Sequence, residues 1–125
     1  MTTTFGIEIE FIMPTGWDGV RIASELSGAS ALPVRSAYRQ TSPGRGWKIC
    51  SDGSVHQSGR FGFEAVSPIL TTETFEQIDR ICRGLSSIGA RVNRTCGLHV
   101  HVGATTLTLD TMKRLAILYA ELESF

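Results

Sequence analysis

The chain has 125 residues, and its 12 Lys and Arg balance its 12 Asp and Glu, so the formal net charge is zero. Hydrophobic residues make up 42% of the chain and charged residues 19%, which is typical of one globular domain and not of a disordered chain. The balance of charge also argues against a basic surface for nucleic acid or for a membrane.

The N-terminus lacks the basic start and the apolar stretch of a signal peptide, and no apolar run approaches the ~20 residues of a spanning helix. The cysteines Cys50, Cys82 and Cys96 are odd in number and form no Cys-x-x-Cys pair, which excludes a disulfide framework and a zinc knuckle. We expect a single cytoplasmic domain over residues 1–125 with reduced, partly buried thiols. A catalytic thiol is the alternative, and Cys96 is its best candidate.

The first predicted element is a strand over Phe5–Met13, which Pro14 ends. Its alternation places Ile7, Ile9, Phe11 and Met13 on one face, and Glu8 and Glu10 on the other. A short amphipathic helix follows over Trp17–Leu26, where Gly28 is expected to end it. Its inward residues are Val20, Ala23 and Leu26.

The middle of the chain is rich in turn-forming residues. Residues 27–46 read as a loop around one short strand near Val34–Tyr38. Trp47–Cys50 then leads into a turn that Asp52-Gly53 predicts. After a further loop, Phe61–Leu70 reads as a strand that carries Glu64.

A second helix is predicted from a cap at Thr71 or Thr72 to Gly89, with Glu73 and Glu76 in its first turn, where they favour the helix dipole. Its inner face comprises Phe75, Ile78, Cys82, Leu85 and Ile88. Ala90–Asn93 reads as a short strand or a connector. This order of elements predicts an α+β fold, with a curved, mostly antiparallel sheet and helices packed on one face.

The last strand is predicted over Leu98–Val102, between Gly97 and Gly103, and it carries His99 and His101. The final helix runs from a cap at Thr108 to the C-terminus. Its predicted inner face comprises Leu109, Met112, Leu115, Tyr119, Leu122 and Phe125. Because this helix ends on an apolar residue without a polar tail, we expect the sequence to stop within an element.

Three predicted strands carry ionisable side chains on one face: Glu8 and Glu10, then Glu64, then His99 and His101. Carboxylates two residues apart on a strand point the same way and repel each other unless a cation or water lies between them. Carboxylate oxygens suit Mg²⁺ or Mn²⁺, and an imidazole among them favours Mn²⁺ or Zn²⁺. If the strands share a sheet, they form a metal site.

Each residue also has a simpler interpretation. Glu8, Glu10 and Glu64 can be the exposed polar face of their strands, and the two histidines a polar face of theirs. Asp52 is a common turn former. The repeated pattern of Glu and His within apolar strands favours the functional interpretation over these alternatives.

Four segments together resemble the amidoligase family, which belongs to the superfamily of glutamine synthetase and glutamate–cysteine ligase. They are Gly6–Phe11, Trp47–Val55, Glu64–Leu70 and Asn93–Gly103. The most specific motif is Cys-Gly-Leu-His-Val-His-Val-Gly in order after Gly-x-Glu-x-Glu-Phe. The resemblance runs from Phe5 to the end of the chain and implies the N-terminal half of a glutamine-synthetase-like catalytic domain.

The resemblance implies ATP-dependent amide or peptide bond formation through an acyl phosphate, with Mg²⁺ or Mn²⁺ as cofactor. It implies Glu8, Glu10, Glu64 and His99 as metal ligands. His101 would approach the nucleotide phosphates, and Asp52 would assist the incoming amine. Gly97 and Gly103 would let the backbone approach the ligand closely. The substrates would be a small-molecule or peptide carboxylate and an amine.

Family members are about twice as long as this chain, and the absent half would supply an acidic ligand and the arginines that steady the phosphates. The chain is therefore expected to be a fragment of such an enzyme or a natural short relative without turnover. One rival is a non-catalytic binding or assembly module that docks a partner or a second copy of the chain through Leu118, Leu122 and Phe125. The other is a zinc or iron hydrolase that uses His99, His101 and Glu64.

Overall fold

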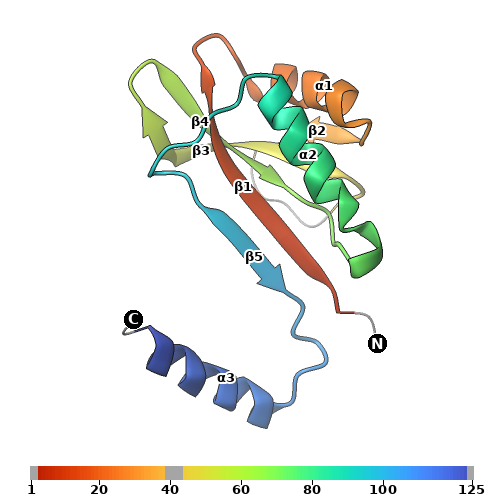
Figure 1. The fold of residues 1–125 in the computed structure, drawn as a ribbon, viewed down its shortest axis with the longest axis vertical. Helices are drawn as coiled ribbons and strands as arrows, with labels where there is room; N and C mark the ends of the chain where they lie inside the picture. The colour runs from red at the N-terminus through yellow and green to blue at the C-terminus, as the bar shows by residue number, and fades with distance from the viewer. Residues whose placement is uncertain (1–2, 39–43, 124–125) are drawn as a thin grey trace.

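Five strands form one sheet in the order β2-β3-β4-β1-β5 (Figure 1). The structure is a computed structural model, and it describes residues 3–38 and 44–123. The strands are β1 (Phe5–Pro14), β2 (Val34–Ser36), β3 (Trp47–Gln57), β4 (Arg60–Val66) and β5 (Leu98–Val102). The helices are α1 (Gly19–Ser30), α2 (Glu76–Ser87) and α3 (Leu109–Leu122), with a short 3₁₀-helix η1 (Thr72–Thr74). Strand β2 pairs with β3 in parallel and the other neighbours pair antiparallel, which confirms the predicted α+β fold.

Helices α1 and α2 lie side by side over one face of the sheet, as predicted (Figure 1). Alternate residues of the strands meet them there, because successive strand side chains point to opposite faces. The buried core comprises Phe11, Met13, Ile22, Ala23, Leu26, Leu32, Trp47, Ile49, Phe63, Ala65, Leu70, Ile81 and Leu85. This core packs against one face of β1, β3 and β4 and supports these three strands.

Helix α1 is longer than predicted. Asp18 caps it, because its Oδ1 accepts a hydrogen bond of 2.8 Å from the backbone N–H of Arg21. Gly28 does not end the helix, which continues to Ser30 and ends where Ala31 takes a left-handed conformation with a φ of 52°. The Ser30 hydroxyl donates to the Leu26 carbonyl. The prediction that Val20 faces inward is also wrong, because its side chain is 69% exposed while Ile22 takes the inner position.

The turn predicted at Asp52-Gly53 is not a hairpin turn. The pairing of β3 with β4 shifts between Ser51 and His56, so residues 52–55 form a bulge, and the chain turns at Ser58-Gly59 instead. Asp52 still provides turn chemistry inside the bulge, where its Oδ1 accepts hydrogen bonds from the N–H and hydroxyl of Ser54. Two predicted boundaries also move, since β2 ends at Ser36 and β4 ends at Val66. Residues 39–43 of the predicted loop lie outside the described residues.

Helix α2 begins after the 3₁₀ turn that Thr71 caps, and Gly89 follows its end with a φ of 90°. Leu85 faces the core as predicted, together with Ile81, and the predicted inner residues Ile78 and Ile88 pack against the core in part. Phe75 and Cys82 are exposed, and their prediction as inner residues is wrong. Residues 90–93 are a connector that pairs with β1 through one bridge at Arg91.

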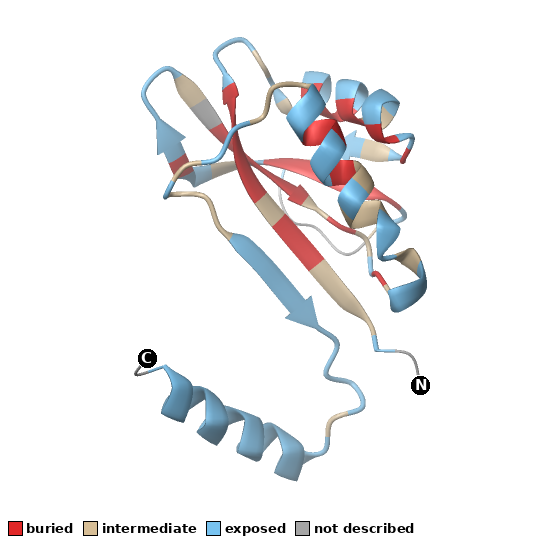
Figure 2. Ribbon diagram, in the orientation of Figure 1, coloured by how far each residue is buried: buried red, intermediate tan, exposed pale blue. Residues whose placement is uncertain are grey.

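The C-terminal part of the structure differs from the rest. Every described residue of β5 and α3 is exposed (Figure 2). The predicted inner face of α3 therefore packs on nothing that the structure describes, and its predicted last member, Phe125, lies outside the described residues. Across residues 3–38 and 44–123, no helix has the length and apolar character needed to cross a membrane.

Candidate functional site

The face of the sheet away from α1 and α2 carries the candidate site. Two rows of paired residues cross it. One row joins Lys48, Val66, Glu8 and His99, and the other joins Cys50, Glu64 and Glu10. Because directly paired residues share a face, the register brings the predicted carboxylates and His99 together.

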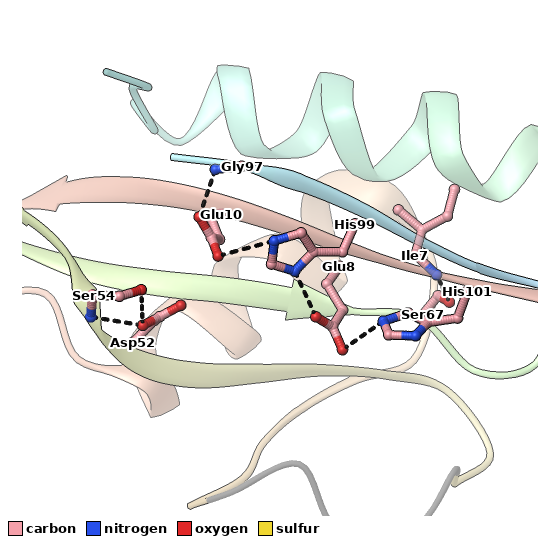
Figure 3. Close-up of polar contacts among 9 residues, drawn as sticks. All are labelled: Ile7, Glu8, Glu10, Asp52, Ser54, Ser67, Gly97, His99 and His101. Atoms are coloured by element: carbon pink, nitrogen blue, oxygen red, sulfur yellow. Dashed lines mark hydrogen bonds and ion pairs between the residues drawn. The ribbon is translucent and has the colours of Figure 1, made fainter. Parts of the chain in front are cut away.

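Contacts between the side chains connect β1 to β5 (Figure 3). His99 lies between two carboxylates, with its Nδ1 2.9 Å from Glu8 Oε2 and its Nε2 3.7 Å from Glu10 Oε1. His101 Nε2 lies 3.2 Å from Glu8 Oε1. At the other end of the chain of contacts, the backbone N–H of Gly97 donates to Glu10 Oε2.

The carboxylates are buried. Glu8 is 8% exposed, Glu10 7% and Glu64 8%. The alternative that these residues are an exposed polar face is therefore wrong. Among the described residues, the buried charged side chains are Glu8, Glu10, Glu64 and Lys48, and the pairing places all four on this face. Buried charges of this kind are stable only when they are paired or bind an ion.

The charges around His99 favour its protonated form. The hydrogen bond to Glu8 raises the pKa of His99 above its ordinary value of 6.5, and the nearby Glu10 adds to this effect. The imidazole is 52% exposed, so solvent reaches it from the open side of β5. In this arrangement His99 partly neutralises the carboxylates of β1.

Asp52 lies at the edge of the site, in the bulge of β3. Hydrogen bonds from Ser54 lower the pKa of Asp52, and contributions from Glu10 and His99 act in the same direction. The structure therefore gives Asp52 an electrostatic link to the cluster although its direct partner is Ser54. Its carboxylate is ionised at neutral pH.

The two glycines that bracket β5 have different neighbours. A Cβ at Gly97 would lie 3.2 Å from His99 Nε2 and 3.3 Å from Glu10 Oε2, so this backbone touches the candidate ligands. A Cβ at Gly103 would instead clash with Thr4. Gly103 thus has a packing role, because its N–H also donates to the Thr4 carbonyl at 2.8 Å.

Two further residues, Lys48 and Cys50, lie on this face and were not predicted as part of the site. Each is 2% exposed. Burial, and next to it the charge of Glu64, raises the pKa of the Cys50 thiol. The alternation of Trp47 and Ile49 with these residues was the available signal, since the two large apolar side chains fix the core side of the strand. Cys96, the other thiol near the site, is half-buried.

The donor set fits a divalent cation by its chemistry, since three buried carboxylates and an imidazole lie on neighbouring strands. The side chains do not form a ready coordination shell. Within the described ranges, no three His, Cys, Asp or Glu side chains are arranged to hold a metal ion. His99 and Glu10 instead bond to Glu8 and to the Gly97 backbone, so metal binding requires these side chains to exchange contacts.

Comparison with known proteins identifies the family. The family model described as a putative amidoligase enzyme matches residues 1–125, which is the whole chain. Searches of curated proteins and of solved structures gave no significant match. Because the family model covers every residue, including the strands that carry the carboxylates and histidines, this chain belongs to the amidoligase family.

Proposed function

We propose that this chain carries the metal-binding part of an ATP-dependent carboxylate–amine ligase. In that reaction ATP phosphorylates a carboxylate, and an amine then displaces phosphate from the acyl phosphate to leave an amide. The observation that carries the proposal is the concentration of buried charge on one sheet face, where Glu8, Glu10 and Glu64 adjoin each other. The family match supports a ligase, and the expected setting is the cytoplasm.

The chain's own residues divide the work. Glu8, Glu10, Glu64 and His99 would hold Mg²⁺ or Mn²⁺, which neutralises the phosphates during phosphoryl transfer. His101, 3.2 Å from Glu8, is positioned to contact the nucleotide phosphates beside that cation. Asp52 keeps a negative charge at neutral pH, which suits it to attract a cationic amine.

Thermal unfolding in the presence of cation and nucleotide tests this proposal. We expect Mn²⁺ or Mg²⁺ to raise the Tm of the wild type, and ATP to raise it further. A ligand at 100 times its Kd stabilises the folded state by about 2.7 kcal/mol. Glu10→Gln should lose most of the cation-dependent rise, because it removes a buried ligand charge. Glu25→Gln, at an exposed position on α1, is the matched control.

Two results would contradict the proposal. One is a wild type whose Tm does not respond to either cation. The other is protein purified without added ions that contains stoichiometric zinc and ignores Mg²⁺, which would favour the hydrolase alternative with His99, His101 and Glu64.

The exposed C-terminal segment favours a second candidate, an assembly function in which two copies pair. Helix α3 presents the exposed apolar side chains Leu109, Met112, Leu115, Leu118, Tyr119 and Leu122, and β5 presents Leu98, Val100 and Val102. A helix of 14 residues is marginal in water without a packing surface. A two-fold pair would cover both surfaces at once, with each α3 lying on the partner's β5.

Light scattering of the purified chain tests this second candidate. The expected wild type is a dimer, and Leu115→Glu should shift it to monomer. Glu25→Gln should leave the mass unchanged, since Glu25 is an exposed residue of α1, which packs on β2 and β3 at the opposite edge of the sheet from β5. A monomeric wild type at high protein concentration would rule out pairing through this segment.

A further inference from the structure

A pocket opens at one end of the polar face. It has a volume of about 450 Å³. Its polar lining includes Glu8, Lys48 and His101, and apolar walls come from Val66, Pro68 and Val102. Glu10, Glu64 and Asp52 do not border it. The pocket therefore meets the candidate metal site at Glu8 alone.

Two basic groups stand on either side of that carboxylate. Lys48 pairs with Val66, and Val66 pairs with Glu8, so Lys48 lies two strands from β1 on the same face. His101 approaches Glu8 from β5 on the opposite side, at 3.2 Å. On β2, Arg35 pairs with Lys48 and continues the basic side of the face.

Lys48 is unusual because it is a buried lysine within a strand of the sheet. Its side chain is 2% exposed although it borders the pocket, and fully buried lysines are rare. It already has an interaction partner in the structure. Its charge and that of Arg35 act on Cys50 in the direction opposite to Glu64 and Glu8, which places all four within electrostatic reach of one point.

We infer that Lys48 binds the anionic end of a substrate in this pocket, beside the cation that Glu8 helps to hold. The inference rests on the proposed function and adds a residue to it. A cation at Glu8 adds positive charge between Lys48 and His101, so the floor of the pocket becomes strongly favourable for an oxyanion. The buried ammonium gives strong charge-assisted hydrogen bonds to such a group.

The ligand class follows from the lining. The polar end of the pocket suits a phosphoryl or carboxylate group, and the walls of Val66, Pro68 and Val102 suit an apolar or flat body. Two of the three reactants of the proposed ligase, ATP and the carboxylate substrate, carry such a group. A phosphoryl group and a carboxylate group would both fit the polar end of the pocket, and binding measurements with one probe of each kind distinguish them.

Calorimetric titration in constant, saturating Mg²⁺ tests the inference with two probes, tripolyphosphate and succinate. We expect the wild type to bind one of them at one site. Lys48→Met should weaken that binding by about tenfold or more, as loss of a hydrogen bond to a charged group does. Lys48→Arg should keep most of it. Lys113→Met, at an exposed position on α3, is the matched control and should change nothing.

Titration of Mg²⁺ alone distinguishes failure of the proposed cation site from failure of the proposed anion binding by Lys48. Lys48→Met should bind Mg²⁺ within about threefold of wild type, since Lys48 is not a proposed ligand. No Mg²⁺ binding in the wild type would overturn the proposed function. Normal Mg²⁺ binding with equal anion binding by wild type and Lys48→Met, or with no binding of either probe, would overturn this inference. Circular dichroism checks folding, and Lys48→Gln replaces the Met variant if that variant does not fold.

Discussion

The segment from β1 to α2 and the segment from β5 to α3 are both rich in apolar residues, but they use these residues in different ways. The first buries it between a sheet and two helices, with Phe11, Ile22 and Trp47 at 1% exposure or less. The second leaves it in solvent, with Val100 at 59% and Leu115 at 55%. The difference shows that β5 is held by its backbone pairing with β1 and by its histidines, and not by a core of its own.

This contrast divides the candidate site. The carboxylates sit on β1 and β4, which the core supports from behind, whereas His99 and His101 sit on an edge strand with an uncovered apolar side. The acidic half of the site is therefore fixed and the histidine half is free to adjust. A partner surface that covers β5 and α3 would also order the histidines.

The largest expected effect is on the free energy of unfolding, when one leucine from each segment is replaced by alanine. Leu26→Ala opens a cavity in the core and should lower the free energy of unfolding by about 2–5 kcal/mol. Leu115→Ala on α3 should change it by less than about 0.5 kcal/mol in the monomer. Urea unfolding at low protein concentration measures both. Similar losses for the two variants would show that α3 packs on the core.

The second comparison concerns two glycines, Gly53 in the bulge of β3 and Gly62 on β4 next to that bulge. A Cβ at Gly62 would meet the carbonyl oxygens of Val55 and Asp52, whereas a Cβ at Gly53 would meet nothing within 4 Å. Gly62→Ala should therefore cost about 1–3 kcal/mol and displace Asp52 from the site, while Gly53→Ala should be nearly neutral. Thermal unfolding of both variants checks this, and equal Tm values would contradict the bulge geometry.

A smaller effect is the pH dependence of stability that arises from the contact of Glu8 on β1 with His99 on β5. Because Glu8 raises the pKa of His99 in the metal-free protein, this pair stabilises the folded state below pH about 6.5. That stabilisation is lost as the pH rises through the folded-state pKa. NMR titration of the imidazole should give His99 a pKa above 6.5 in the wild type and a lower one in Glu8→Gln. An unchanged pKa in the variant would mean that β5 does not keep this contact in solution.

The smallest effect is in thiol reactivity. Cys50 is buried on the polar face with a raised pKa, and Cys82 is exposed on α2. Burial raises the pKa of the Cys82 thiol too, so the difference between the two thiols lies in their exposure. Brief alkylation of the folded protein, read by mass spectrometry, should modify Cys82 and leave Cys50 unmodified. Modification of Cys50 at the rate seen in urea would show that the polar face opens readily.

Most elements could be predicted from local pattern, and the errors have physical causes. The alternation in β1 and the helical spacing in α2 follow from period and burial, so their type was correct. The position of the β3–β4 turn was wrong because Asp52-Gly53 has hairpin chemistry but Gly62 lets the chain bulge there instead. The inner face of α3 was wrong because an amphipathic pattern does not say whether the surface that covers it is present.

The acidic and histidine residues of the candidate site could be selected from the sequence, because Glu8 and Glu10 and then His99 and His101 recur at a spacing of two within apolar strands, and Glu64 lies within a third. The pairing register of the strands that carry these residues could not be predicted, since the pairing of Glu10 with Glu64 depends on the order of strands in the sheet. Lys48 was missed because a lysine in a strand usually lies in solvent, and only the packing of Trp47 and Ile49 shows that it does not.

The most direct test of the central claim, that the polar face binds a divalent cation, is an NMR titration with Mg²⁺. We predict that Mg²⁺ shifts the ring signals of His99 and the amide signal of Gly97, whose N–H donates to Glu10 in the metal-free protein. The ring of His56, which follows the bulge of β3, should keep its position. The same shifts should disappear in Glu10→Gln. Mg²⁺ that leaves His99 and Gly97 unchanged, or that shifts them equally in Glu10→Gln, would contradict the account.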